Sequence, residues 1–201
     1  MATIVLVHGG WSGGWNWQGV ARRLRAAGHE VYAPTLTGLG ERVHLATPAV
    51  GLDTHIVDIV NVLAYEDLRD VVLAGHSYGG MVITGVAAQA PERLAQLVYL
   101  DAYVPHAGES MLDLVAPAAR QTLEDQFRTG GDGWRTPGLG GETDRHVPHP
   151  WKCFVQPLPA GGHDTTAIPR TYVQFTADKG PDEFMGMCFA RSVERARSGA
   201  W

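Results

Sequence analysis

The sequence predicts an α/β fold, in which helices cover both faces of a mostly parallel β-sheet. The first observation behind this prediction is that short apolar runs alternate along the chain with stretches of helical spacing. The second is the apolar run Val71–Ala74, which passes through a glycine-rich turn directly into a helical pattern. A continuous apolar run of this length is typical of a strand that is covered on both faces.

The predicted elements follow one another as strand and helix. Strands are expected at Thr3–Val7, Val31–Ala33, Val71–Ala74, Leu97–Leu100 and Thr171–Thr176. Helices are expected around Trp17–Leu24, Leu52–Leu63, Gly79–Ala90 and Leu112–Phe127, with a last helix from Pro181 to a stop at Gly199. The stretch from Thr35 to Pro48 is rich in glycine and threonine, which predicts a loop.

Composition limits the classes of function. The 201 residues are 45% hydrophobic and 18% charged, as expected of a globular chain with one sizeable core. A net charge of −5 provides no basic surface for nucleic acid or an anionic membrane. No apolar run has the length of a membrane span, and Ile4–Val7 is interpreted as a buried strand rather than a signal peptide. Cys153 and Cys188 form no disulfide framework, so a cytoplasmic location is expected.

The alternation is lost between residues 106 and 169, where prolines and glycine pairs are frequent. We predict that this segment is a cap inserted over the carboxyl ends of the strands, where such folds bind substrate. The expected domains are a core of residues 1–105 and 170–201 and a cap of residues 106–169. Trp134, Trp151 and Phe154 are candidates for the substrate pocket and equally for the interior of the cap.

The motif Gly75-His76-Ser77-Tyr78-Gly79 lies directly after a predicted strand and before a predicted helix. This is the G-x-S-x-G nucleophile elbow of the α/β-hydrolase fold. The sharp turn forces the serine into a strained backbone conformation, so its neighbours must be small. The serine hydroxyl then lies at a helix N-terminus, where partial positive charge favours a developing oxyanion. Ser77 is therefore the predicted catalytic nucleophile.

The motif His8-Gly9-Gly10-Trp11 ends the first predicted strand. Acyl transfer needs two N–H donors for the oxyanion. One donor comes from the residue after the nucleophile, Tyr78, and the other from the loop after the neighbouring strand, for which Gly10 is the candidate. We expect His8 to have a structural role in packing and loop hydrogen bonding.

The candidate catalytic acid is Asp178, just after the fifth predicted strand. Its place agrees with the order serine, acid, histidine of this fold. Asp178 could instead be a turn or helix-cap residue, and Asp101 is the competing acid at the end of the fourth strand. Asp182 is better explained as a residue of the first turn of a helix.

Metal and cofactor sites have no support in the sequence. His146 and His149 lie in a proline-rich stretch without acidic or thiol partners at ligand spacing. The chain has no P-loop or dinucleotide fingerprint, since Gly38-Leu39-Gly40 lacks the third glycine and the following helix. We therefore expect no metal and no cofactor.

Three segments together resemble the plant methylesterase and hydroxynitrile lyase family and its small bacterial esterase relatives. They are Val7–Trp17, the elbow Gly75–Gly80 and Thr176–Gly180. The resemblance implies a six-stranded sheet in the order 2-1-3-4-5-6, a helical cap, ester substrates and no cofactor. It also implies that homodimers are common. The lyase members have a threonine where this chain has Gly9, so the esterases are the better match.

The leading hypothesis is a serine carboxylesterase that hydrolyses small carboxylic esters through an acyl-enzyme. One alternative is a catalytically silent hydrolase fold that binds a small hydrophobic ligand. Another is hydroxynitrile-lyase chemistry, which Gly9 disfavours because it offers no hydroxyl to a cyanohydrin.

A sixth strand is expected beyond residue 201, because the alternation calls for a strand after the last helix. The resemblance implies that this strand leads to a loop with the catalytic histidine, which is therefore also expected beyond residue 201. The motif Gly161-Gly162-His163-Asp164 resembles the family's histidine motif but precedes Asp178, against the expected order. His163 is therefore a minor candidate for the base, and His106 and His149 are weaker ones.

Overall fold

The computed structural model describes residues 1–138, 145–177, 183–199 and 201. Its centre is a sheet in the order β2-β1-β3-β4-β7, with every neighbouring pair parallel. The strands are β1 (Thr3–Val7), β2 (Glu30–Tyr32), β3 (Val71–Ser77), β4 (Leu94–Ala102) and β7 (Arg170–Val173). The α/β-hydrolase fold and the order of its first five strands are thus confirmed, and the described part of the sheet contains no sixth strand.

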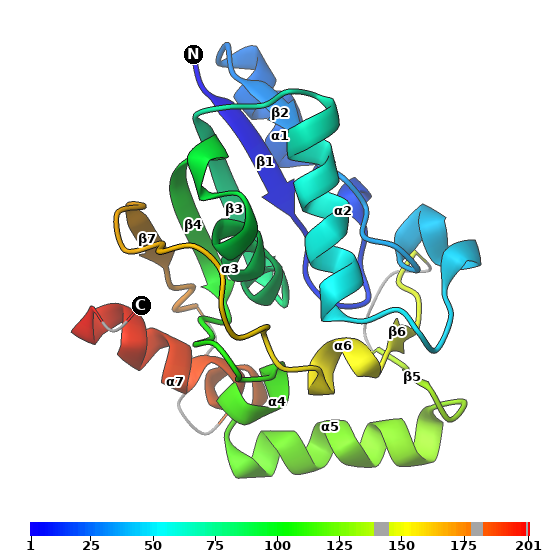
Figure 1. Ribbon diagram of the computed structural model, residues 1–201. Coiled ribbons are helices and arrows are strands. Elements are labelled where there is room, and N and C mark those ends of the chain that lie inside the picture. Colours follow the sequence, from blue (N-terminus) through cyan, green and yellow to red (C-terminus); the bar gives the residue numbers. More distant parts are fainter. Residues whose placement is uncertain (139–144, 178–182, 200) are drawn as a thin grey trace.

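Helices cover both faces of the sheet because side chains along β1 alternate between two cores. Val5 and Val7 belong to the larger core, together with apolar residues of α2 (Leu52–Tyr65) and α3 (Gly79–Gln89). Ile4 and Leu6 point to the opposite face and pack in a smaller core with residues of α1 (Gln18–Ala26). Figure 1 shows α2 and α3 together on one face. Across the described residues, no helix is long and apolar enough to cross a membrane.

The predicted cap segment lies beyond the carboxyl ends of the strands (Figure 1). Its elements are α4 (Met111–Leu114), α5 (Pro117–Gly130), β5 (Arg135–Thr136), β6 (His149–Pro150) and α6 (Lys152–Val155). The chain then returns to the sheet as β7 and ends in α7 (Phe184–Ser198), which packs against α4 and α5. The cap boundaries at 106 and 169 stay a prediction.

Two helix predictions need correction. The single helix expected over Leu112–Phe127 is two helices, α4 and α5, because Pro117 begins the second one. A residue before proline is pushed out of the helical region, and Ala116 accordingly has ψ 148°. The last described helix begins at Phe184, and Pro181 and Asp182 lie outside the described residues. Its stop is as predicted, since Gly199 has a left-handed φ of 72°.

The short 3-10 helices of the described chain lie in connections. They are Gly14–Trp17, Gly40–Leu45 and Pro91–Arg93. The second of them falls within the stretch Thr35–Pro48 that was predicted to be a loop, so that prediction is only partly correct.

A two-pronged ion pair connects α7 to the chain that follows β4. Both terminal nitrogens of Arg195 donate to the carboxylate of Glu109, at 2.6 and 2.7 Å, and Arg191 adds a third hydrogen bond. These bonds lower the pKa of Glu109 to about 2. Arg195 is only 8% exposed, so the loss of its partner would leave a cation poorly hydrated.

We expect Glu109→Gln to lower the free energy of unfolding at pH 7 by about 2 kcal/mol. The folded-state pKa is depressed, so this stabilisation is present above the unfolded pKa of about 4.5 and is lost as the pH falls toward 2. Urea unfolding of both proteins at pH 7 and pH 3 checks this. As a control, Glu124→Gln removes an exposed pair with Arg120 and should change stability by less than about 0.5 kcal/mol. If the difference in unfolding free energy between the wild type and Glu109→Gln were the same at pH 7 and pH 3, the role of the ionised Glu109 would be contradicted.

Candidate active site

Ser77 lies at the turn from β3 into α3, where the elbow motif predicted it. Its φ is 52°, a left-handed value that L-residues rarely adopt. The turn is possible because the chain is packed against glycines. A Cβ on Gly75 would lie 2.6 Å from the Gly79 carbonyl oxygen, and one on Gly80 would lie 2.1 Å from the Tyr103 carbonyl oxygen. The side chain of Ser77 is half-buried at the carboxyl edge of the sheet.

The loop after β1 lies against Ser77. A Cβ on Gly9 would be 3.1 Å from Ser77 Cβ, so the chain passes within contact distance of the serine. The N–H groups of Gly10 and Tyr78 donate to no acceptor among the described residues. Among the described residues, two donors without acceptors therefore lie on the two segments that meet at Ser77, the loop after β1 and the start of α3.

Ser77 opens into a small apolar cavity of about 30 Å³. Besides Ser77 and Tyr78, its lining consists of aromatic, aliphatic and sulfur-containing side chains: Trp11, Tyr103, Met111, Leu123, Phe154, Phe184, Met185, Cys188 and Phe189. These residues come from the β1 loop, the chain directly after β4, the cap segment and α7. Of the three aromatic residues considered as pocket candidates, Phe154 lines this cavity, whereas Trp134 and Trp151 are not among its lining residues.

The acidic candidates are only partly described. Asp178 and Asp182 lie outside the described residues. Asp101 is described: it is the last but one residue of β4, next to the strand that carries Ser77, with φ 47° and 2% exposure. Its carboxylate accepts the N–H of Phe175 at 3.3 Å.

None of the described histidines donates to or accepts from Ser77 Oγ within the described ranges. The N–H of His163 donates to the Ala88 carbonyl, near the C-terminal end of α3. Ser77 lies just before the opposite, N-terminal end of that helix, which begins at Gly79. At a rise of 1.5 Å per residue, Gly79 and Ala88 are about 14 Å apart. Geometry thus argues against His163 as the base. The N–H of His106 donates to Glu109 on the surface.

His8 makes hydrogen bonds of the kind expected for a structural residue. Its Nδ1 donates to the Gly9 carbonyl at 2.8 Å, and its Nε2 accepts the N–H of Leu36 at 3.1 Å. Burial lowers the pKa of His8 to about 4, so the ring is neutral near pH 7.

The sequence of this chain matches a model of an alpha/beta hydrolase family over residues 4–195. The chain belongs to this alpha/beta hydrolase family. Among its relatives is a carbendazim hydrolyzing esterase from a Nocardioides species, 43% identical over 173 residues, which are 86% of this chain and 66% of that protein. A pyrethroid hydrolase from Sphingobium wenxiniae is 33% identical over 116 residues, covering 57% of this chain and 40% of that protein. The chain spans less than two thirds of the length of these curated relatives.

Solved structures of alpha/beta hydrolases share the fold. An extracellular α/β-hydrolase from a Paenibacillus species, described as homologous to tobacco salicylic acid binding protein 2, superimposes with a TM-score of 0.76. Its sequence is 26% identical, and the match covers 95% of this chain and 86% of that one. The predicted resemblance to the plant methylesterase family and its bacterial esterase relatives is thereby confirmed; tobacco salicylic acid-binding protein 2 itself is 31% identical over 103 residues, which are 51% of this chain and 40% of that protein.

Sequence reasoning missed a buried polar cluster behind the elbow. Ligand atoms of His55, His149 and Cys153 lie within 4.8 Å of one another. His55 Nε2 donates to the Thr37 carbonyl, so its Nδ1 accepts the hydroxyl of Tyr78 at 3.0 Å. The available signal was His55 on the apolar stripe of α2, three residues after Leu52.

This cluster fits a hydrogen-bond network better than a metal site. The Nδ1 lone pair of His149 already accepts the N–H of Trp11, and the lone pair of His55 accepts from Tyr78. A cation would have to displace both bonds. Burial also raises the pKa of the Cys153 thiol to about 12, which opposes the thiolate that a metal would need.

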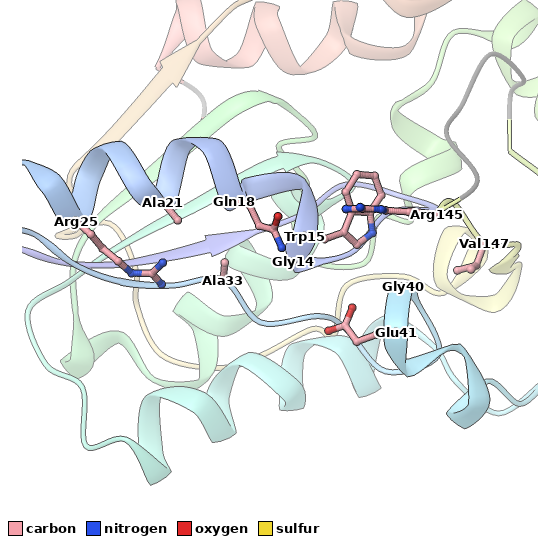
Figure 2. Close-up of a pocket in the computed structure, with 10 residues that line it drawn as sticks. All are labelled: Gly14, Trp15, Gln18, Ala21, Arg25, Ala33, Gly40, Glu41, Arg145 and Val147. Atoms are coloured by element: carbon pink, nitrogen blue, oxygen red, sulfur yellow. The ribbon is translucent and has the colours of Figure 1, made fainter.

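A larger hollow of about 680 Å³ lies apart from Ser77. Figure 2 shows it between α1, the chain after β2 and the cap residues Arg145 and Val147. Trp15 and Glu41 line it, but neither Ser77 nor the β1 loop residue Gly10 does. The hollow is therefore not the candidate active site.

Proposed function

We propose that this chain hydrolyses small carboxylic esters through an acyl-enzyme, with Ser77 as the nucleophile. One observation carries the proposal: Ser77 is held at a left-handed φ where the start of α3 meets the loop after β1, and the Tyr78 and Gly10 N–H groups of these two segments have no acceptor among the described residues. This supports an arrangement in which the nucleophile and the oxyanion hole act on the same carbonyl group. The names of the relatives, a carbendazim hydrolyzing esterase and a pyrethroid hydrolase, support ester hydrolysis over the alternatives.

In the proposed reaction Ser77 Oγ attacks the carbonyl carbon, and the oxygen that becomes negative accepts hydrogen bonds from Gly10 and Tyr78. No described histidine is hydrogen-bonded to Ser77, so the proposal needs a further histidine as the base. Oriented by Asp178, it takes the Oγ proton and passes it to the departing alcohol. Water then takes the place of the alcohol. The histidine removes a proton from water as its oxygen attacks the acyl carbon, and returns the proton to Ser77 Oγ as the bond to the acyl group breaks and the acid leaves. The apolar lining around Ser77 suits an ester with an aromatic or alkyl group.

Labelling with a fluorophosphonate, followed by peptide mass spectrometry, tests the nucleophile. We expect one label, on Ser77, and none on Ser77→Ala. An ester panel of nitrophenyl acetate, butyrate and octanoate then tests turnover. A label on another residue, or equal turnover by Ser77→Ala, would overturn the proposal. Absence of turnover together with ligand-induced stabilisation of the folded protein would favour the silent ligand binder.

A further inference from the structure

Trp11, the residue after the candidate donor Gly10, is held by the cap through three hydrogen bonds. Its backbone N–H donates to His149 Nδ1 at 3.1 Å, and its carbonyl accepts the N–H of Val147 at 3.0 Å. The indole Nε1 donates to the Thr136 carbonyl at 3.1 Å. His149 and Thr136 are paired residues of β6 and β5, so both ends of Trp11 are attached to the same small sheet.

These bonds hold a strained conformation. Trp11 has φ 60°, which is disfavoured for a bulky L-residue and persists only where the surroundings impose it. The Gly10–Trp11 peptide carries the N–H that His149 accepts. Since Gly10 has no side chain to fix its own backbone, the orientation of its N–H depends on how the next peptide is held.

His149 also contacts the other half of the candidate oxyanion hole. Its ring packs edge-on against the ring of Tyr78, with centroids 5.0 Å apart. A Cβ on Gly10 would lie 3.6 Å from His149 Nδ1. The imidazole is fully buried, and its burial keeps it neutral, so that Nδ1 stays available as an acceptor. One cap residue thus touches both segments that provide the unpaired N–H groups.

We propose that His149 is a positioning residue, through which the β5–β6 sheet of the cap holds the Gly10 and Tyr78 donors in place for the oxyanion. This inference rests on the proposed ester hydrolysis. His149 acts through Trp11 and Tyr78 and does not touch the reacting atoms. The cap then helps to stabilise the transition state as well as to enclose the substrate.

Three variants at position 149 distinguish the effect of the acceptor atom from the effect of the volume of the ring. His149→Asn keeps an oxygen acceptor near the position of Nδ1, His149→Gln moves its acceptor further out, and His149→Leu has none. We expect His149→Leu and His149→Gln to lower kcat for nitrophenyl acetate about 100-fold, with KM changed less than about threefold. His149→Asn should recover most of kcat.

Hydrogen exchange of the Trp11 amide, followed by NMR, provides a readout independent of activity. We expect protection in the wild type and His149→Asn, and faster exchange in His149→Leu. Wild-type turnover tests the proposed function, whereas the ratio of kcat between His149→Asn and His149→Leu tests the role of His149. Equal kcat in all variants, or an Asn variant as impaired as the Leu variant, would overturn the positioning role even if the wild type is an esterase. If His149→Leu does not fold, the Asn and Gln pair decides.

Discussion

Replacing Ser77 with glycine is expected to remove ester hydrolysis and, at the same time, to stabilise the fold. Loss of the nucleophile should lower kcat/KM for nitrophenyl esters by about 10⁴-fold or more. The φ of 52° at this position is strained for serine and unstrained for glycine. We therefore expect the free energy of unfolding to rise by about 1 kcal/mol.

The matched variant is Ser77→Ala, which also lacks the hydroxyl but keeps the strain. It should lose as much activity as Ser77→Gly without the gain in stability. Initial rates and urea unfolding of the three proteins separate the two effects. An alanine variant as stable as the glycine variant would show that the elbow stores no strain.

The substitution Gly80→Ala is expected to destabilise the protein by about 3 kcal/mol or more. The added Cβ would lie 2.1 Å from the Tyr103 carbonyl oxygen and 2.9 Å from its nitrogen. Both atoms belong to the backbone after β4, so no side chain can rotate away. The N-terminal turn of α3 would have to move from the sheet and carry Ser77 with it.

Two other helix glycines are controls for this prediction. A Cβ on Gly19 in α1 would meet nothing within 4 Å, so Gly19→Ala should be neutral or stabilise by up to about 1 kcal/mol. A Cβ on Gly85 in α3 would meet the end of the Ile56 side chain at 2.2 Å, which can partly shift. Thermal unfolding should therefore rank the three alanine variants from most to least destabilised as Gly80, Gly85 and Gly19. A Gly80→Ala protein as stable as the wild type would contradict the close approach.

Local patterns sufficed to predict much of this fold and the central part of its candidate site. Val71–Ala74 could be assigned to a covered strand from its apolar residues alone, and the glycines around Ser77 identify the turn that follows it. Gly10 and Tyr78 could be paired with Ser77 because the strands before these residues are parallel neighbours. Each of these inferences depends on residues that are close in sequence or on the regular geometry of a parallel sheet.

The role of the imidazoles could not be predicted in this way. His149 lies 138 positions after Trp11 in a proline-rich stretch, and no local signal indicates that its Nδ1 would accept the Trp11 N–H. His163 has the more suggestive sequence motif, yet the chain places it against the far end of α3. Cap segments lack the repeating strand–helix geometry of the core, so only the packed tertiary structure decides which of their side chains reach the site. That packing brings His149 onto the loop beside Ser77 and leaves His163 outside.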